Sequence, residues 1–370
     1  MRVLLIANTG WYLRNFRSRL AERLEMQGYT VILAAPPDEE TNGVFFRKRQ
    51  FEPLRLSRKG RNPILELLAI FRFVRLFRRV RPDLVLTWTA KPDIYAGIVG
   101  RFLGITVIPN VSGLGVVFAK RGLLARLIGR LYGYAFAHSP VVFFQNEEDR
   151  AAFIAAHRVT QAQAKRLPGS GVSLDHFLLE PLPNGIFVFC FVGRLLAEKG
   201  LRELVEAGEQ LRSEGRRFAL RIAGFLDPGN PTAIPRQELQ SWVASGKVEY
   251  VGPLVDVRPA LAAAHCVVLP SYRREGVPRS LLEAAAMGRP VIAADAPGCR
   301  DALLPGKSGF LCQVRNVESL AECMRRMLDL SAPALAAMGS AGRQYMEQEF
   351  SEEIVLHAYL DQCRRLLNKS

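Results

Sequence analysis

Short apolar runs alternate with helix-length amphipathic stretches along most of the chain, and this alternation starts afresh once. The strands that it predicts in the first half are Val3–Ala7, Thr30–Ala35, Leu84–Thr87, Thr106–Ile108 and Val141–Phe144. After a turn-rich stretch, the predicted strands are Phe187–Val192, Phe218–Ala223, Val248–Val251, Val267–Leu269 and Val291–Ala294. Continuous apolar strands separated by helices are typical of parallel sheets covered on both faces. The sequence therefore predicts an α/β protein with two doubly wound domains.

The turn-rich stretch gives the predicted domain boundaries. The 370 residues are enough for two domains of roughly 150–200 residues each. We expect a first domain over residues 1–172, a second over 173–350 and a C-terminal segment over 351–370. The helix predicted for Glu352–Leu367 either completes the second domain or returns to brace the first.

Cysteine placement and hydropathy indicate the expected compartment. The six cysteines form no C-x-x-C pair, and several lie inside apolar strand-like runs, so we expect them to be reduced and mostly buried, in a reducing compartment. The apolar run at the start is too short for a signal peptide. Residues 102–119 carry no charge, but Pro109, Asn110 and Gly113 favour a strand followed by a loop over a membrane span. We expect a soluble or peripheral chain.

Positive charge is concentrated in the first half. Residues 1–183 hold 27 basic and 14 acidic residues, whereas residues 184–370 hold 23 and 21. Helix-like stretches over 63–80 and 123–134 combine apolar residues with arginines, as helices on an anionic membrane leaflet do, although a helix that covers a sheet has the same pattern. No nucleic-acid-binding module is recognisable. The predicted membrane-facing residues are Arg55, Arg58, Lys59, Arg61, Arg72, Arg75 and Arg79.

Charged residues and glycines recur directly after the predicted strands, where open parallel sheets bind their ligands. Arg194 and Lys199 share one strand-to-helix loop, with Glu198 as their only acidic neighbour in the sequence, and an Arg–Lys pair suits a diphosphate. Glu275 and Glu283 follow a later strand, where carboxylates can accept hydrogen bonds from sugar hydroxyls. Unrelated surface salt bridges are the alternative for all four side chains.

The motifs around these residues resemble family 4 of the retaining glycosyltransferases, which have the GT-B fold of two Rossmann-like domains with a cleft between them. The resemblance lies in Gly193-Arg194, Glu198-Lys199-Gly200 and the stretch from Pro270 to Ala284, and it covers essentially the whole chain. The last stretch is similar to bacterial enzymes that extend undecaprenyl-diphosphate-linked sugars. These include N-acetylgalactosaminyltransferases of the protein N-glycosylation type and capsule or O-antigen transferases.

The resemblance implies a role for each matching residue. Arg194 and Lys199 would bind the donor diphosphate and stabilise its charge, Glu275 would hold the donor sugar and Glu283 the ribose, with Glu275, Arg194 and Lys199 as the catalytic set. The full donor-binding set would be Gly10, Arg194, Lys199, Gly252, Leu254, Glu275, Gly276, Val277, Pro278, Ser280, Leu281 and Glu283.

The chain departs from the family where many members place a histidine near the transferred sugar. The region from Pro109 to Gly115 has none, so we assign no general base. We interpret Ser112 and Gly113 as part of the acceptor wall, and Lys91 as facing an acceptor phosphate. No D-x-D motif is present, and Glu147 and Asp149 after Asn146 indicate helix capping, so we expect no metal and no cofactor.

Together these features predict a metal-independent, retaining glycosyltransferase. The donor would be a UDP-linked N-acetylhexosamine such as UDP-GalNAc, and the acceptor a polyprenyl-diphosphate-linked sugar in bacterial surface-glycan or glycoprotein assembly. The enzyme would be cytoplasmic and peripheral on the inner face of the membrane. Alternatives are the same chemistry on a soluble acceptor, a basic nucleic-acid-binding protein without catalysis, and an inactive protein that binds nucleotide sugars.

Overall fold

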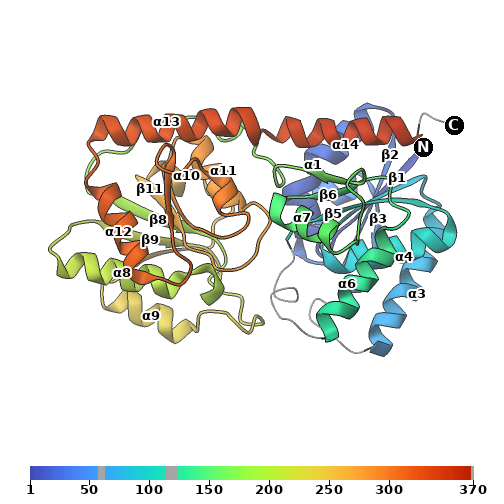
Figure 1. Cartoon of the computed structure of the whole chain (residues 1–370), viewed down its shortest axis with the longest axis horizontal. Coiled ribbons are helices and arrows are strands. Elements are labelled where there is room, and N and C mark those ends of the chain that lie inside the picture. Colours follow the sequence, from blue (N-terminus) through green and yellow to red (C-terminus); the bar gives the residue numbers. More distant parts are fainter. Residues whose placement is uncertain (57–62, 114–122, 368–370) are drawn as a thin grey trace. The chain divides into compact units, whose positions relative to one another are not determined.

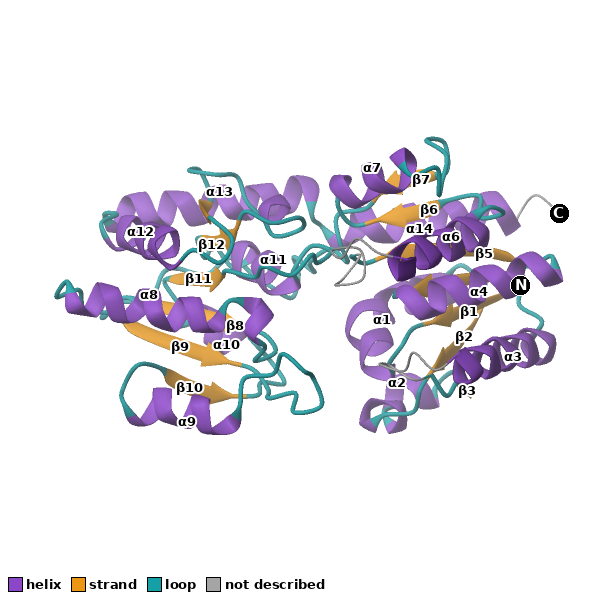
Figure 2. Ribbon diagram, turned by 60° about the horizontal axis from the view of Figure 1, so that its bottom comes forward, coloured by secondary structure: helices purple, strands orange, loops and turns teal. Residues whose placement is uncertain are grey.

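The computed structural model describes residues 1–56, 63–113 and 123–367. It divides the chain into two compact units. The first combines residues 1–170 with residues 353–370, and the second comprises residues 171–352. Each unit is a parallel sheet with helices packed on its two faces (Figures 1 and 2).

The first unit has a seven-stranded sheet in the order β3-β2-β1-β4-β5-β6-β7. Its strands are β1 (Arg2–Ile6), β2 (Thr30–Ala35), β3 (Gln50–Pro53), β4 (Leu84–Trp88), β5 (Thr106–Val111), β6 (Val142–Phe144) and β7 (Ala164–Arg166). Its helices are α1 (Gly10–Met26), α2 (Val44–Arg47), α3 (Pro63–Val80), α4 (Ala90–Leu103), α6 (Leu123–Phe136), α7 (Glu147–Ala155) and α14 (Glu352–Leu367), with a 3₁₀ turn η1 (Glu39–Asn42).

The second unit has a six-stranded sheet in the order β10-β9-β8-β11-β12-β13. Its strands are β8 (Val188–Val192), β9 (Ala219–Ala223), β10 (Glu249–Gly252), β11 (Cys266–Leu269), β12 (Val291–Ala294) and β13 (Gly309–Cys312). Its helices are α8 (Leu201–Ser213), α9 (Arg236–Ala244), α10 (Arg258–Ala262), α11 (Arg279–Ala286), α12 (Val317–Leu328) and α13 (Ala332–Glu349), with 3₁₀ turns η2 (Ala197–Lys199) and η3 (Arg300–Ala302).

The first sheet buries apolar side chains on both faces. One face packs against α1 and α14, and the other against α3, α4, α6 and α7. The helix α14 inserts Tyr359 into this unit, where its hydroxyl accepts hydrogen bonds from Trp88 Nε1 at 2.9 Å and from Asn110 Nδ2 at 2.7 Å. Since both donors lie at the carboxyl ends of central strands, the last helix of the chain is part of the first unit's core.

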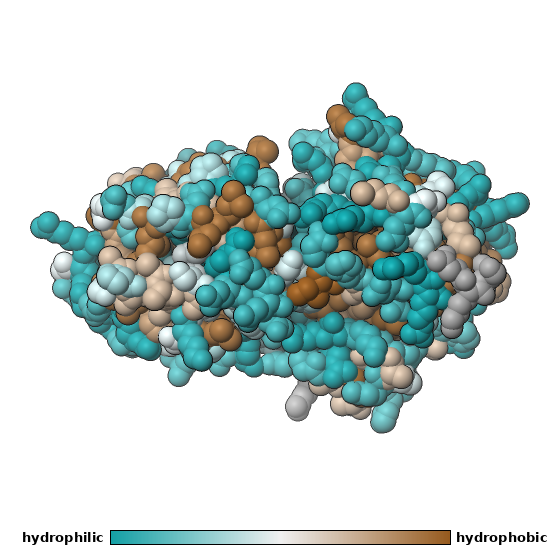
Figure 3. Space-filling model, turned by 90° about the horizontal axis from the view of Figure 1, so that it is seen from above, coloured by the Kyte–Doolittle hydropathy of each residue, from teal (hydrophilic) through white to brown (hydrophobic). Residues whose placement is uncertain are grey.

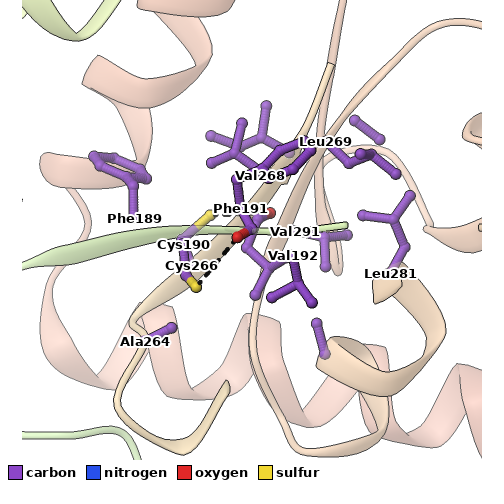
Figure 4. Packing of buried hydrophobic residues seen from close by; sticks show 14 of the residues in the cluster. Phe189, Cys190, Phe191, Val192, Ala264, Cys266, Val268, Leu269, Leu281 and Val291 are labelled. Atoms are coloured by element: carbon purple, nitrogen blue, oxygen red, sulfur yellow. Dashed lines mark hydrogen bonds between the residues drawn. The ribbon is translucent and has the colours of Figure 1, made fainter. Parts of the chain in front are cut away.

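The core of the second unit combines buried side chains of its central strands with those of α8, α11, α12 and α13. Figure 4 shows Phe189 and Phe191 of β8, Val268 and Leu269 of β11 and Leu281 of α11 among the packed side chains. All six cysteines of the chain are free and buried, so the expectation of reduced, buried thiols is confirmed. Burial raises the pKa of the Cys190 thiol to about 12, which keeps this thiol protonated.

The predicted strands all overlap strands of the structure, and the α/β class with two doubly wound sheets is confirmed. The strands β3, β7 and β13 were not predicted as strands. The helix α1 begins at Gly10, because Thr9 accepts a hydrogen bond from the Tyr12 N–H and so caps the first turn.

In the part of the chain that the structure describes, none of the helices combines the length and apolar character that crossing a bilayer requires. The uncharged stretch after Arg101 begins with the end of α4 and continues into β5, as the strand interpretation expects. Most residues on the face seen in Figure 3 are hydrophilic, and hydrophobic residues lie among them.

Candidate functional site

An ion pair joins two strand-end loops of the second unit. Lys199, in the loop after β8, places Nζ 2.7 Å from Oε2 of Glu275, in the loop after β11. Ser271 Oγ donates to the other carboxylate oxygen of Glu275 at 2.9 Å. The two charged side chains are only 12% and 17% exposed, so the pair is held in a fixed place with little water around it.

Backbone geometry fixes the loop that carries Lys199. The short η2 turn ends at Gly200, which has φ +78° and precedes α8. A Cβ on Gly200 would lie 2.2 Å from the carbonyl oxygen of Pro270, so only glycine lets the two loops approach so closely. The carbonyl of Glu198 accepts from the Tyr272 N–H at 3.1 Å, and its carboxylate pairs with Arg273. The Glu198-Lys199-Gly200 motif therefore clamps one loop to the other.

The environment of Glu275 favours its charged form. Burial alone would raise its pKa, but the charge of Lys199, hydrogen bonds from Lys199 and Ser271, and the charge of Arg273 together lower the pKa below its ordinary value. Glu275 is thus a carboxylate at neutral pH, able to accept hydrogen bonds from a ligand.

The second cation of this edge is Arg194. Its guanidinium lies 3.5 Å from Asp227 Oδ2, and its side chain is 39% exposed, which leaves donors available to a ligand. The loop after β9 supports it, because Leu195 N–H donates to the Phe225 carbonyl at 3.1 Å.

The acidic partners of the two cations are not their neighbours in the sequence. Lys199 pairs with Glu275 and Arg194 with Asp227, while Glu198 itself pairs with Arg273. Sequence distance hides both partners, since each comes from the end of another strand.

Glu283 lies on α11 and pairs with Arg279 one turn earlier, with 2.8 Å between Arg279 Nε and Glu283 Oε1. Burial raises the pKa of Glu283, against the opposing effect of Arg279, and the charge of Asp256 raises it further. The two carboxylates that the sequence singled out are thus in electrostatically different surroundings, since the pKa of Glu275 is lowered.

The other residues expected to bind a donor fall into two groups. Gly252 ends β10 and Leu254 follows it, and Leu254 packs partly against the core. Gly276, Val277, Pro278, Ser280 and Leu281 form the entry to α11. Leu281 is fully buried in the core (Figure 4) and its N–H donates to the Pro278 carbonyl at 3.2 Å, so its side chain has a packing role.

Packing within the first unit accounts for a glycine at position 10 without any ligand. A Cβ on Gly10 would lie 2.4 Å from Thr41 Cγ2 and 2.5 Å from Asp38 Oδ1. The other oxygen of Asp38 accepts from the Trp11 N–H at 2.9 Å, at the start of α1. The glycine thus lets η1 and the residue before it pack on the first turn of α1.

Three residues were expected near an acceptor. Lys91 Nζ lies 2.5 Å from Glu66 Oε1 and thereby links α4 to α3. Ser112 and Gly113 follow β5 and are partly exposed. They lie at the carboxyl end of a central strand, the edge at which open parallel sheets bind ligands.

The arginines expected to face a membrane are exposed where the structure describes them, namely Arg55, Arg72, Arg75 and Arg79. Arg58, Lys59 and Arg61 lie outside the described residues. Arg72 donates to the Arg55 carbonyl at 2.9 Å, and Arg79 pairs with Glu52.

Sequence reasoning missed several partners in the second unit. Asp227 and Ser271 bind the expected site residues Arg194 and Glu275, and Arg273 binds Glu198 beside Lys199. These three residues could have been found because each follows a predicted strand closely in the sequence. Arg279 could have been found from its spacing of four residues before Glu283 on a helix.

Among the described residues, no group of three or more His, Cys, Asp and Glu side chains is placed to hold a metal ion. Asn146 caps α7 by accepting from the Asp149 N–H at 2.7 Å, which confirms the capping interpretation of that segment.

The comparisons with known protein families assign both halves of the chain. Residues 2–146 match the family described as "Glycosyl transferase 4-like", and residues 186–330 match "Glycosyl transferases group 1". The two matches together include most of both sheets.

Two curated relatives show how far the similarity extends. The N,N'-diacetylbacillosaminyl-diphospho-undecaprenol alpha-1,3-N-acetylgalactosaminyltransferase of Campylobacter jejuni is 23% identical over 385 residues, covering 99% of this chain and 99% of that protein. The capsular polysaccharide biosynthesis glycosyltransferase CapM of Staphylococcus aureus is 22% identical over 310 residues, or 78% of each chain.

Solved structures share the fold over the full length. A sucrose-phosphate synthase from Thermosynechococcus elongatus has a TM-score of 0.80 at 20% identity, covering 100% of both chains. Anabaena Alr3699/HepE in complex with UDP has a TM-score of 0.76 at 17% identity, covering 99% of this chain and 100% of that one.

Proposed function

Because the chain belongs to the group 1 and 4-like glycosyltransferases, we propose that it transfers a sugar from a UDP-sugar, with retention of configuration, to a polyprenyl-diphosphate-linked sugar. An N-acetylhexosamine such as GalNAc is the proposed donor sugar, on the likeness to the Campylobacter jejuni N-acetylgalactosaminyltransferase. The name of that relative also specifies a diphospho-undecaprenol acceptor. A UDP complex among the structural neighbours supports the nucleotide.

The observation that carries this proposal is the largely buried Lys199–Glu275 pair at the carboxyl edge of the second sheet. The pair sets a cation, which suits a diphosphate, beside a carboxylate, which suits sugar hydroxyls. In the proposed complex, Lys199 and Arg194 bind the diphosphate, Glu275 holds the donor sugar and Glu283 the ribose. Preorganised charges of this kind stabilise the negative charge that develops on a leaving diphosphate.

The transfer breaks the bond between the anomeric carbon and the UDP oxygen, and it forms a bond from the acceptor hydroxyl to the same face of that carbon. The acceptor proton passes to an oxygen of the leaving diphosphate, so the reaction needs no protein base. With Arg194 and Lys199 beside the phosphates, we propose turnover without a metal ion.

The proposed acceptor places the enzyme at the inner face of the cytoplasmic membrane. The exposed arginines Arg55, Arg72 and Arg75 carry charge of the sign that an anionic surface attracts. Lys91 and the residues after β5 are the proposed contacts of the acceptor headgroup.

The first experiment is thermal unfolding in EDTA with UDP, GDP, ADP, CMP and dTDP. A nucleotide at 100 times its Kd adds about 2.7 kcal/mol of stability. We expect a shift with UDP that Arg194→Ala abolishes and Arg216→Ala retains, because Arg216 pairs with Asp329 on the surface, away from the expected site residues. A thermal shift with another nucleotide alone would show that the donor carries that nucleotide instead of UDP. No thermal shift with any of the nucleotides would contradict the proposed donor-binding site.

Transfer itself is then measured with UDP-sugars and a polyprenyl-diphosphate acceptor in EDTA, with the anomeric configuration of the product read by NMR. An inverted product, or activity that returns only on addition of Mg²⁺, would contradict the proposed mechanism.

A further inference from the structure

The first half of α3 exposes large apolar side chains. Ile64, Leu67 and Phe71 are 70%, 64% and 73% exposed, and Leu65 and Leu68 are 48% and 47% exposed. Aliphatic and aromatic side chains at this level of exposure, gathered within two turns of one helix, are uncommon on a soluble surface. They mark a surface that binds something apolar.

These residues are not the ones that attach α3 to its sheet. The core side of the helix consists of Ala69, Phe73, Leu76, Phe77 and Val80, which are all buried. The helix is therefore apolar on two sides. Among the described residues, the core accounts for one side, whereas the exposed side chains of the other, at the amino-terminal end, lie outside the core cluster.

The helix α6 also exposes apolar side chains in its first turns. Both α3 and α6 pack against α4, and Figure 1 shows the two helices flanking α4 with their first turns at the same end. Leu127 and Leu131 of α6 are 55% and 37% exposed. We call these two residues, together with Ile64, Leu65, Leu67, Leu68 and Phe71, the α3–α6 patch.

The charges beside the α3–α6 patch have one sign. Arg72 and Arg75 on α3, and Arg126 and Arg130 on α6, are exposed. The sequence of α6 contains no acidic residue. Glu66 is the one acidic residue in the α3 sequence, and Lys91 neutralises it at 2.5 Å. Apolar side chains beside unopposed arginines complement a bilayer with anionic headgroups, in which each kind of side chain has a partner.

We propose that the α3–α6 patch inserts into an anionic bilayer, with its apolar side chains below the headgroups and the arginines at the lipid phosphates. This deepens the proposed function, since the acceptor named there is anchored in a membrane. A nucleic acid would use the arginines but leave the apolar side chains in water. Charge attraction alone, without insertion, would likewise leave the patch without a role.

Flotation of the whole protein with vesicles tests the patch. Vesicles of phosphatidylcholine are compared with vesicles that contain phosphatidylglycerol as well. We expect Leu67→Ser/Phe71→Ser to lower the partition coefficient on anionic vesicles at least about tenfold. Met26→Ser/Val44→Ser is the matched control, because these side chains of the same unit are 78% and 65% exposed, and it should bind as the wild type does.

Insertion is then measured directly. Since all six native cysteines are buried, a Leu68→Cys variant can be labelled selectively with an environment-sensitive fluorophore. Its emission should shift to the blue on anionic vesicles and be quenched by lipids with a spin label in the acyl chain, whereas a label at Met26→Cys should change little.

Equal flotation of the patch variant and the wild type, or a Leu68→Cys label that stays in water, would overturn the proposal. Binding that falls only in Arg72→Glu/Arg75→Glu would show a purely electrostatic contact and would overturn insertion as well. The UDP thermal shift separates this result from a failure of the proposed function, because the patch variants should retain that shift in full.

Discussion

Lys199 and Glu275, which are 76 positions apart in the sequence, form an ion pair of 2.7 Å between the loops after β8 and β11. These two strands are neighbours in the sheet, so the pair closes the edge between them. Ser271 also donates a hydrogen bond to Glu275, and the carbonyl of Glu198 accepts one from Ser271 in the same loop. The pair thus has a part in the fold as well as its proposed part in donor binding.

Removal of Lys199 alone should destabilise the protein more than removal of both charges of the Lys199–Glu275 pair. We expect Lys199→Met to lower the free energy of unfolding by about 2–4 kcal/mol, because it leaves the largely buried Glu275 carboxylate without its cation. Glu275→Gln should lower the free energy of unfolding by less than Lys199→Met does. The double variant should show a coupling free energy of about 1–3 kcal/mol between the two positions. Urea unfolding at pH 7 measures all four proteins, and additive effects would contradict the structural role of the pair.

The two carboxylates of the site should respond to pH in opposite directions. The pKa of Glu275 is lowered in the folded protein, so its contribution to stability is present above its unfolded pKa and is lost as the pH falls through the folded value. The pKa of Glu283 is raised, so its charge opposes folding once the pH rises above the unfolded value.

Urea unfolding of Glu275→Gln and Glu283→Gln between pH 4 and 7.5 measures this difference. Between pH 7 and pH 4, the deficit of Glu275→Gln relative to the wild type should shrink. Over the same range, the stability of Glu283→Gln relative to the wild type should fall. Parallel curves for the two variants would show that the surroundings of the carboxylates do not differ as described.

Gly200 should tolerate no side chain. Gly200→Ala adds a Cβ that lies 2.2 Å from the Pro270 carbonyl oxygen, at φ +78°. We expect a loss of about 3 kcal/mol or more, together with loss of UDP binding, because the loop that carries Lys199 must move. Gly215→Ala is the control, since Gly215 has φ +81° with nothing within 4 Å of its Cβ, and it should cost about 1–2 kcal/mol through backbone strain alone. Equal losses in the two variants would remove the close approach as a constraint.

Most of the strands that the sequence predicted are buried on both faces, such as β4, whose residues are all buried, whereas the predicted β10 is partly exposed. The edge strand β7 reads Ala-Lys-Arg with two exposed side chains, and β3 contains Glu52, so neither contains an apolar run. The period of α3 showed an apolar stripe, but it could not show that the exposed part of the helix would be apolar too. Periodicity gives the spacing of apolar residues and leaves open which side meets the sheet.

The candidate site was also predicted only in part. The positions of Arg194, Lys199, Glu275 and Glu283 after strands were predicted, because the carboxyl ends of parallel strands meet at one edge. The pairing of Lys199 with Glu275, and of Arg194 with Asp227, was not predicted. These pairs depend on the order of strands in the sheet, which sequence spacing does not give.

Gly10 offers a test between packing and donor binding. If Gly10 is glycine because Asp38 and Thr41 fill the space beside it, Gly10→Ala should cost about 1–2 kcal/mol in the wild type and under about 0.5 kcal/mol in an Asp38→Ala/Thr41→Ser background. Urea unfolding gives both values. A loss of UDP affinity on Gly10→Ala that is equal in the two backgrounds would instead make Gly10 a donor contact.

The Tyr359 hydroxyl should be worth more than an ordinary buried hydroxyl. Tyr359→Phe leaves Trp88 Nε1 and Asn110 Nδ2 without the acceptor that both use, and we expect it to lower the free energy of unfolding by about 2–4 kcal/mol. Tyr345→Phe, which removes the hydrogen bond of 3.2 Å from the Tyr345 hydroxyl to the Asp301 carbonyl, should lower the free energy of unfolding by about 1 kcal/mol. Equal effects would mean that Tyr359 anchors α14 through its ring alone.

The place of α14 also determines the order in which the molecule can be made. The first sheet emerges from the ribosome before any residue of the second unit, but one of its faces is completed by Tyr359 and its neighbours on the last helix. Until α14 has been synthesised, the side chains that it covers, such as Trp88 and Phe143, lack their final partner. The first unit to be synthesised is therefore the last to be finished, and the second unit, which needs no later segment, can fold while the first still waits for its closing helix.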